Sequence, residues 1–188
     1  MLRYLQTQRR SEGIPQALVI LHENQAYCPV FVHAAVDQDR AIGDIETFSE
    51  HTHDLYHIVL YTRSKGHYLK CGRKHEAEPG TLVIVSPGQA HDFVSLRDSS
   101  VYSEITFSLV TQAGKVLTMP FERVLATYTG VCGRIAEDLR LSKEASQELV
   151  IIMIQIMDYL QSPSPMSDFY AQRALANVTG SLWDVQAS

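Results

Sequence analysis

Short runs of strand-forming residues, separated by turn signals, fill the chain from Ala17 to Leu109 and constrain its fold more than any other feature. Gly, Pro and Asp mark the connections, as in Pro79-Gly80, because these residues adopt the backbone angles of tight turns. Many short strands with this punctuation favour a sandwich or barrel over a parallel sheet. The expected strands are residues 17–21, 30–36, 51–62, 67–71, 82–85 and 101–109.

The pattern becomes helical near residue 119. Pro120 suits the first turn of a short helix, where a missing N–H costs nothing. Ser142 can cap a longer helix that carries Glu144 in its first turn and runs to about Gln161. A second helix is expected over roughly Asp168–Val178. The sequence thus predicts an N-terminal arm over 1–16, a barrel over 17–118 and a helical appendage over 119–188.

The charge balance argues against direct contact with nucleic acid. The 188 residues carry a net charge of -5, whereas nucleic-acid binding needs clustered Lys and Arg. The start lacks the apolar core of a signal peptide, and no apolar run is long enough to span a bilayer. The three cysteines form no CxxC pair, which favours reduced thiols. We therefore expect a cytoplasmic protein with no membrane contact and no DNA-binding domain in this chain.

Four histidines form the candidate site. His51, His53 and His57 have the same parity in one expected strand, so their side chains project to the same face. His91 follows the turn at Pro87-Gly88, which can bring it to the same place. Four imidazoles can bind one divalent transition metal ion, or they can hydrogen-bond one another, backbone carbonyls or a bound organic molecule. Both interpretations require the four rings to converge.

Neighbouring strands offer further candidates for a small-molecule pocket, namely His33 and Tyr61. Pocket walls are typically apolar with a few fixed polar groups. Apolar and polar residues alternate in the 101–109 strand, and we expect its more polar set to face solvent. This set comprises Tyr102, Glu104, Thr106 and Ser108. The alternative places Tyr102 and Glu104 in the pocket. No positioned nucleophile or acid–base pair is evident, so we expect no catalytic residue.

The histidine pattern resembles the two-part signature of the cupins. Its first part is His51-x-His53 with His57 four residues later, and its second part runs from Gly80 to His91. More specifically, the stretch from His53 to Phe93 resembles the N-terminal sensing domain of AraC-type transcription regulators. Residues 105–110 and 120–130 resemble that group as well.

This resemblance implies a mainly β fold, a double-stranded β-helix or jelly-roll barrel, with a C-terminal α-helical pair. In AraC-type regulators the barrel binds a small effector, the helical pair forms a homodimer, and a separate C-terminal domain binds DNA. The chain is therefore expected to be a small-molecule-sensing and dimerisation domain. The alternative, from another class, is a stand-alone metal-binding cupin enzyme of the dioxygenase or isomerase type.

Three positions depart from the cupin pattern. Metal cupins have a glutamate where His57 stands, a proline where Ser86 stands and an asparagine where Ser95 stands. If an ion is bound, the expected ligands are the four histidines His51, His53, His57 and His91, and the expected ion is Zn²⁺ or else Ni, Fe or Mn. The missing glutamate removes the anionic ligand that redox cupins use to hold iron or manganese.

The expected helix over residues 142–161 is apolar over too wide an arc to cover only one face of a small sheet. The apolar residues at helical spacing are Leu149, Ile152, Met153, Ile156 and Leu160, and the stripe is widened by Val150, Ile154 and Met157. An exposed apolar stripe is a liability that a two-fold partner removes by burying the same patch on both chains. We therefore expect a homodimer held by residues 142–183.

Overall fold

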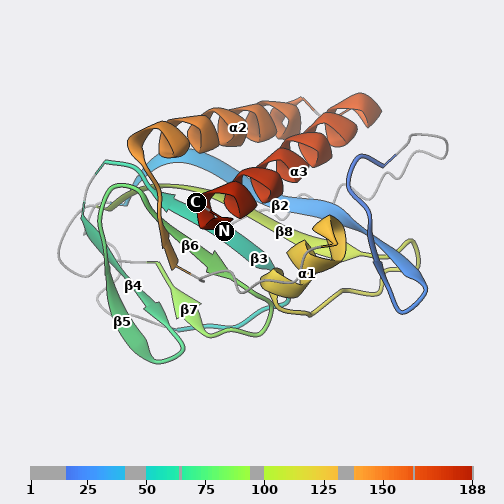
Figure 1. The fold of residues 1–188 in the computed structure, drawn as a ribbon, viewed down its shortest axis with the longest axis horizontal. Helices are drawn as coiled ribbons and strands as arrows, with labels where there is room; N and C mark the ends of the chain where they lie inside the picture. Colours follow the sequence, from blue (N-terminus) through green and yellow to red (C-terminus); the bar gives the residue numbers. More distant parts are fainter. Residues whose placement is uncertain are drawn as a thin grey trace.

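Two antiparallel sheets, a larger and a smaller one, build the β part of the molecule (Figure 1). The structure is a computed structural model that describes residues 16–40, 50–63, 65–93, 100–130, 138–162 and 164–187. The larger sheet has the order β1-β2-β8-β3-β6-β9, and the smaller one the order β5-β4-β7. The strands of the larger sheet are β1 (Ile20–His22), β2 (Gln25–Arg40), β8 (Ser100–Val110), β3 (Tyr56–Tyr61), β6 (Thr81–Val85) and β9 (Asp138–Arg140). Those of the smaller sheet are β5 (Arg73–Ala77), β4 (Gly66–Lys70) and β7 (His91–Asp92).

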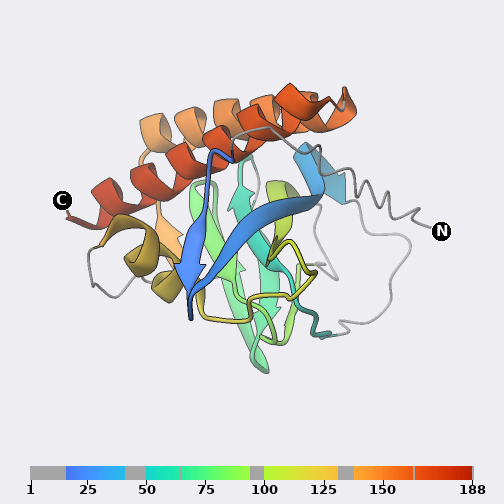
Figure 2. The same ribbon diagram turned by 90° about the vertical axis from the view of Figure 1, so that its right-hand side faces the viewer.

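Helices α2 (Lys143–Gln161) and α3 (Pro165–Ala187) lie side by side over the larger sheet (Figures 1 and 2). The side-chain oxygen of Ser142 accepts a hydrogen bond from the Ala145 N–H at 3.1 Å, so the predicted cap of α2 is present. The expected short helix is α1 (Phe121–Thr129), and Pro120 is its N-cap residue, one position before the first turn. The fold class is therefore confirmed as mainly β, a jelly-roll barrel with a C-terminal helical pair.

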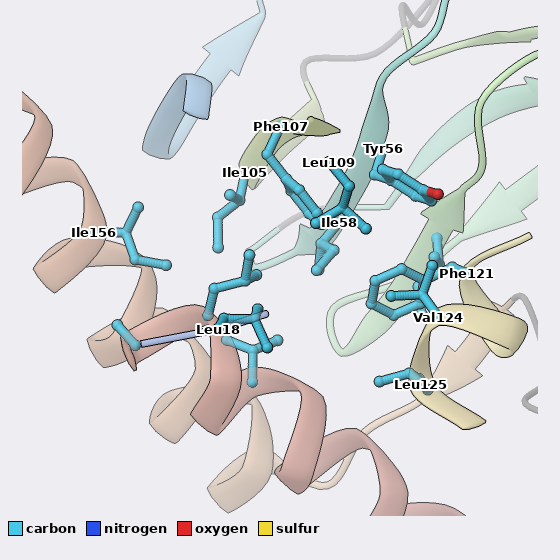
Figure 3. Packing of buried hydrophobic residues seen from close by; sticks show 14 of the residues in the cluster. Leu18, Tyr56, Ile58, Ile105, Phe107, Leu109, Phe121, Val124, Leu125 and Ile156 are labelled. Carbon is cyan, nitrogen blue, oxygen red and sulfur yellow. The ribbon is translucent and has the colours of Figure 1, made fainter. Parts of the chain in front are cut away.

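The main core lies between the larger sheet and the helices. Figure 3 shows Ile156 of α2 and Leu125 of α1 pointing from the helix side toward sheet residues such as Ile58 and Ile105. Tyr56 stacks on Phe107 with ring centroids 5.3 Å apart. Burying a side chain of this size contributes about 1.5–3 kcal/mol, so this layer supplies much of the driving force for folding.

A second core fills the inner face, between the larger and smaller sheets. It contains Val59 and Tyr61 from β3, Tyr68 from β4 and Tyr102 from β8. Because β3 has the helices on one side and the smaller sheet on the other, each of its residues is buried. The residues that face this interior are the ones that position the candidate site.

The more polar side of β8 turns inward, which corrects the expectation that it faces solvent. Tyr102, Glu104, Thr106 and Ser108 are 1%, 8%, 3% and 7% exposed. The predicted alternation of polar and apolar residues is present in β8, but the prediction of which side faces solvent is wrong. The reason is that the helices cover one face of the larger sheet and the smaller sheet covers the other. Polar residues on either face can therefore be buried.

Several elements differ from the expected bounds. The strand expected over 51–62 begins only at Tyr56, and His51 forms an isolated bridge with His91. The second long helix is longer than 168–178 and runs from Pro165 to Ala187. The segment expected to be helical also contributes β9, which pairs with β6 in the larger sheet.

The N-terminal arm expected over residues 1–16 lies outside the described residues except for Gln16. The chain that follows is attached to α3 by Gln172, which is 1% exposed. The Gln172 side-chain oxygen accepts from the Ala17 N–H at 3.1 Å, and its nitrogen donates to Gln16 Oε1 at 2.8 Å.

Among the described helices, none is long and apolar enough to cross a membrane.

Candidate functional site

Backbone hydrogen bonds bring the two parts of the histidine pattern together. His51 and His91 exchange bonds, with N···O distances of 3.2 and 3.1 Å, and the Gly88 N–H donates to the His53 carbonyl at 3.0 Å. Gly88 has a φ of 78°, a conformation that suits glycine because it has no Cβ. The turn before His91 is therefore laid directly against residues 51–53.

The four histidine rings converge on the inner face of the barrel. The His91 ring centroid lies 4.6 Å from that of His51 and 4.8 Å from those of His53 and His57. His51 is exposed and His53 half-buried, whereas His57 and His91 are buried. The cluster thus runs from the solvent at His51 into the interior at His57.

Burial favours the neutral form of His53, His57 and His91. Burial, followed by the neighbouring His91, His53, His51 and His33, lowers the pKa of His57 to about 2. Burial lowers the pKa of His91 to about 4, and burial followed by His51 lowers that of His53. Neutral imidazole is the form that binds transition metals, so His53, His57 and His91 each have a nitrogen lone pair near neutral pH.

Two nitrogen atoms of the cluster are buried without a hydrogen-bond partner, namely His53 Nδ1 and His91 Nε2. His91 Nδ1 lies 2.8 Å from the Gln89 carbonyl oxygen. Because a carbonyl only accepts, His91 Nδ1 carries the proton and Nε2 presents its lone pair. Buried polar atoms are normally satisfied, so two unpartnered nitrogens in one cluster of histidines indicate a ligand position.

The donor set fits a metal ion. His51, His53 and His91 can each offer one atom, and these atoms all lie within 4.8 Å of one another. Three neutral imidazoles suit Zn²⁺ and similar first-row ions. His57 is not one of these three, because its two nitrogens lie 2.9 Å from His53 Nε2 and 3.1 Å from Thr106 Oγ1.

His33 lies beside the cluster, and Tyr61 lies farther along the same face. In the strand register His33 is opposite Thr106, which is in turn opposite His57. His33 Nε2 lies 3.2 Å from a carboxylate oxygen of Glu104. The Tyr61 hydroxyl donates to the His67 carbonyl at 3.2 Å, so its polar atom is engaged by the backbone.

Thr106 and Glu104 lie beside the histidines, although the sequence pattern places both in the set of β8 residues expected to face solvent. The positions of Thr106 and Glu104 follow from the alternation of side chains along β8 together with the register of β8 on β3. The sequence contains the parity, but the register requires the assembled sheet.

The fold and this histidine site define a small-molecule-binding barrel of the cupin type. Residues 36–148, more than half of the chain, match the family model of the AraC-like ligand binding domain. The chain belongs to this family, and it is accordingly a small-molecule-sensing domain. A comparison with curated proteins found no match.

Solved structures of cupin proteins are similar to the chain. A cupin 2 conserved barrel domain protein from Salinispora arenicola is 18% identical, with 53% of this chain and 89% of that chain covered and a TM-score of 0.28. A cupin protein from Bacteroides fragilis is 16% identical, with 64% and 94% covered and a TM-score of 0.28. A cupin 2 barrel protein from Rhodopseudomonas palustris is 17% identical, with 63% and 86% covered and a TM-score of 0.29.

Proposed function

We propose that this chain is the effector-sensing and dimerisation domain of an AraC-type transcription regulator. Membership of the ligand-binding family supports the sensing role. The observation that carries the proposal is the convergence of His51, His53, His57 and His91 on the inner face, with two of their buried nitrogens unpartnered. Such a polar point within an otherwise aromatic interior can orient a small molecule.

In this proposal His51, His53 and His91 hold one divalent first-row ion, with Zn²⁺ the best match to neutral imidazoles. When bound, the ion supplies a positive centre that attracts an electron pair of the effector. The Gln89 carbonyl orients the His91 ring, and the aromatic residues Phe93 and Tyr102 keep water from the inner side. His33 and Glu104 offer the effector additional hydrogen-bonding groups.

The helical pair is the proposed dimer interface. Ile151 and Ile154 of α2 are 56% and 38% exposed, and Met166 and Tyr170 of α3 are 49% and 40% exposed. Met153 and Ile156 belong to the core of the protomer and are 0% exposed, so the expected stripe is divided between the core and the surface. A two-fold partner would cover the exposed part. Effector binding would then shift the balance between arrangements of the two protomers.

Metal titration of the purified, chelator-treated chain tests the site. We expect Zn²⁺ to bind in a one-to-one ratio in isothermal calorimetry, and His53→Ala or His91→Ala to lose that binding. His22→Ala is the matched control, because His22 lies on edge strand β1 outside the cluster. Unchanged Zn²⁺ affinity in both site variants would contradict the metal assignment.

A thermal-shift screen of small anionic and polar compounds, with and without Zn²⁺, tests the sensing role. An effector that binds only the folded chain raises its melting temperature. We expect a hit whose shift is lost in Glu104→Gln or His33→Ala. A hit that raises the melting temperature of these variants as much as that of the unmodified chain would exclude the inner face as its site.

A further inference from the structure

A chain of side-chain hydrogen bonds connects strand β8 to the candidate metal ligands. Thr106 Oγ1 lies 3.1 Å from His57 Nδ1, and His57 Nε2 lies 2.9 Å from His53 Nε2. Thr106 and His57 are 3% and 8% exposed, so these contacts are shielded from solvent. The other ring nitrogen of His53, Nδ1, is buried and has no hydrogen-bond partner.

The hydrogen bonds that join Thr106, His57 and His53 can run in either of two directions. In the first, His57 Nδ1–H donates to Thr106, and His57 Nε2 accepts from His53 Nε2–H, which leaves a lone pair on His53 Nδ1. In the second, Thr106 donates to His57, and His57 Nε2–H donates to His53, which places the proton on His53 Nδ1. Only the first direction gives His53 a lone pair at its unpartnered atom.

We propose that Thr106 and His57 are positioning residues that fix His53 in its metal-binding tautomer, and that His57 is not itself a ligand. The inference rests on the proposed metal site at His51, His53 and His91. His57 then lies outside the ligand set and accepts a hydrogen bond from the metal-bound His53, which orients the His53 ring and raises its basicity. The Gln89 carbonyl does the same for His91, whose Nδ1 it binds at 2.8 Å.

This assignment explains the histidine at a position where a carboxylate ligand is expected. Both His57 nitrogens already have partners in the structure, Thr106 on one side and His53 on the other. The His57 ring is also packed against Phe93, with centroids 5.7 Å apart, which restricts its rotation toward an ion. The ion then has three neutral ligands, which leaves coordination positions for an effector.

Nitrogen-15 NMR of the histidine side chains in the Zn²⁺-loaded chain distinguishes the two roles of His57. We expect His53 to coordinate through Nδ1, His91 through Nε2, and His57 to remain uncoordinated with its proton on Nδ1. A metal-coordinated His57 nitrogen, or His53 coordination through Nε2, would overturn the inference while leaving the metal site intact. Failure of the unmodified chain to bind Zn²⁺ would overturn the proposed site as well.

Substitution of Thr106 tests the origin of the tautomer. Thr106→Val has nearly the same shape, so it should fold, but it removes the acceptor and allows His57 to switch tautomer. We expect a Zn²⁺ affinity lower by about 10- to 100-fold, as for other outer partners of metal ligands. Thr106→Ser should restore the affinity and the His57 Nδ1–H signal.

Ser108→Ala is the matched control, because Ser108 is the next inward-facing hydroxyl of β8 and is 7% exposed. It should leave both the affinity and the spectrum unchanged. An equal loss of affinity in Thr106→Val and Ser108→Ala, or a folded Thr106→Val with unchanged affinity, would overturn the proposal.

Discussion

Ser86 shows how one residue connects the candidate site to the helical layer. It stands where cupins have a proline, and it uses both groups that proline lacks. Its N–H donates to Gln89 Oε1 at 2.7 Å, and its hydroxyl accepts from the Phe121 N–H at 3.0 Å. The second bond satisfies an N–H in the first turn of α1, which has no side-chain cap of its own.

We predict that Ser86→Ala lowers the free energy of unfolding by about 1–3 kcal/mol, because it leaves the buried Phe121 N–H without an acceptor. Urea denaturation followed by circular dichroism measures this change. The control Ser108→Ala removes another buried hydroxyl of the barrel, for which no side-chain hydrogen bond is seen in the described part of the chain. If both variants lose the same stability, the bond to α1 is not the cause.

The buried histidines predict that the metal-free chain loses stability in mild acid. The pKa values of about 2 for His57 and about 4 for His91 lie below the unfolded value of 6.5. Between these values and pH 6.5 the unfolded chain binds more protons, so the free energy of unfolding falls as the pH falls through that window. Each histidine contributes at most about 1.4 kcal/mol per pH unit.

Urea denaturation in the presence of a chelator at pH 7.5, 6.5 and 5.5 measures this effect. We expect little change between the first two values and a marked loss at the third. His91→Gln should reduce the slope of the profile between pH 6.5 and 5.5, while His57 still contributes. A profile of the unmodified chain that is flat in this range would show that the histidines are not held neutral.

At the scale of elements, the short strand β9 joins the barrel to the helical pair. Lys70 of β4 is 5% exposed, and its ammonium donates to the Ile84 carbonyl at 2.9 Å and to Asp138 of β9 at 3.3 Å. The Leu141 N–H then donates to the Gly80 carbonyl at 2.9 Å. Since Lys70 is also paired with His91 in the smaller sheet, these contacts connect the site with the segment that begins α2.

We predict that Asp138→Asn destabilises the chain by about 1–3 kcal/mol, because a buried ammonium loses its charged acceptor. Glu78→Gln is the control, since it breaks the more exposed pairs with Lys65 and Arg140, which solvent screens, and should cost less than Asp138→Asn. Thermal unfolding of both variants compares the two losses. Equal losses would mean that burial of Lys70 adds nothing to its contact with Asp138.

At the scale of the whole molecule, the described protomer leaves apolar side chains of α2 and α3 in contact with solvent. We predict that the double variant Ile151→Glu and Ile154→Glu is a folded monomer, whereas the unmodified chain is a dimer. Both side chains are exposed in the protomer, so charge there should disrupt the dimer alone. Sedimentation velocity with circular dichroism measures assembly and folding together.

Ile156→Glu is the control for this prediction. Ile156 is 0% exposed within the protomer, so a charge there should unfold the chain rather than only dissociate it. An unmodified chain that sediments as a monomer at tens of micromolar would contradict the dimer. Periodicity alone places Ile154 and Ile156 in one apolar stripe, and only the structure shows that Ile154 is exposed and Ile156 is buried.

The sequence by itself determined the features that depend on local chemistry and periodicity. The shared parity of His51, His53 and His57 assumed one strand from residue 51, whereas β3 begins at Tyr56 and the bridge between His51 and His91 brings the rings together. Turn residues such as Gly88 and the Ser142 cap, by contrast, correctly predicted a barrel and a capped helix. Each of these signals acts within a few residues of the chain, so no knowledge of distant contacts was needed.

Only the tertiary structure decided the properties that depend on which surfaces are covered and which strands are neighbours. The inward direction of Glu104 and Thr106 follows from the smaller sheet, which covers the face that the sequence marked as polar. The hydrogen bond between Thr106 and His57 follows from the register of β8 on β3. Likewise, packing of α2 on the barrel divides its apolar arc into core and surface, because burial is a property of contacts between elements rather than of one helix.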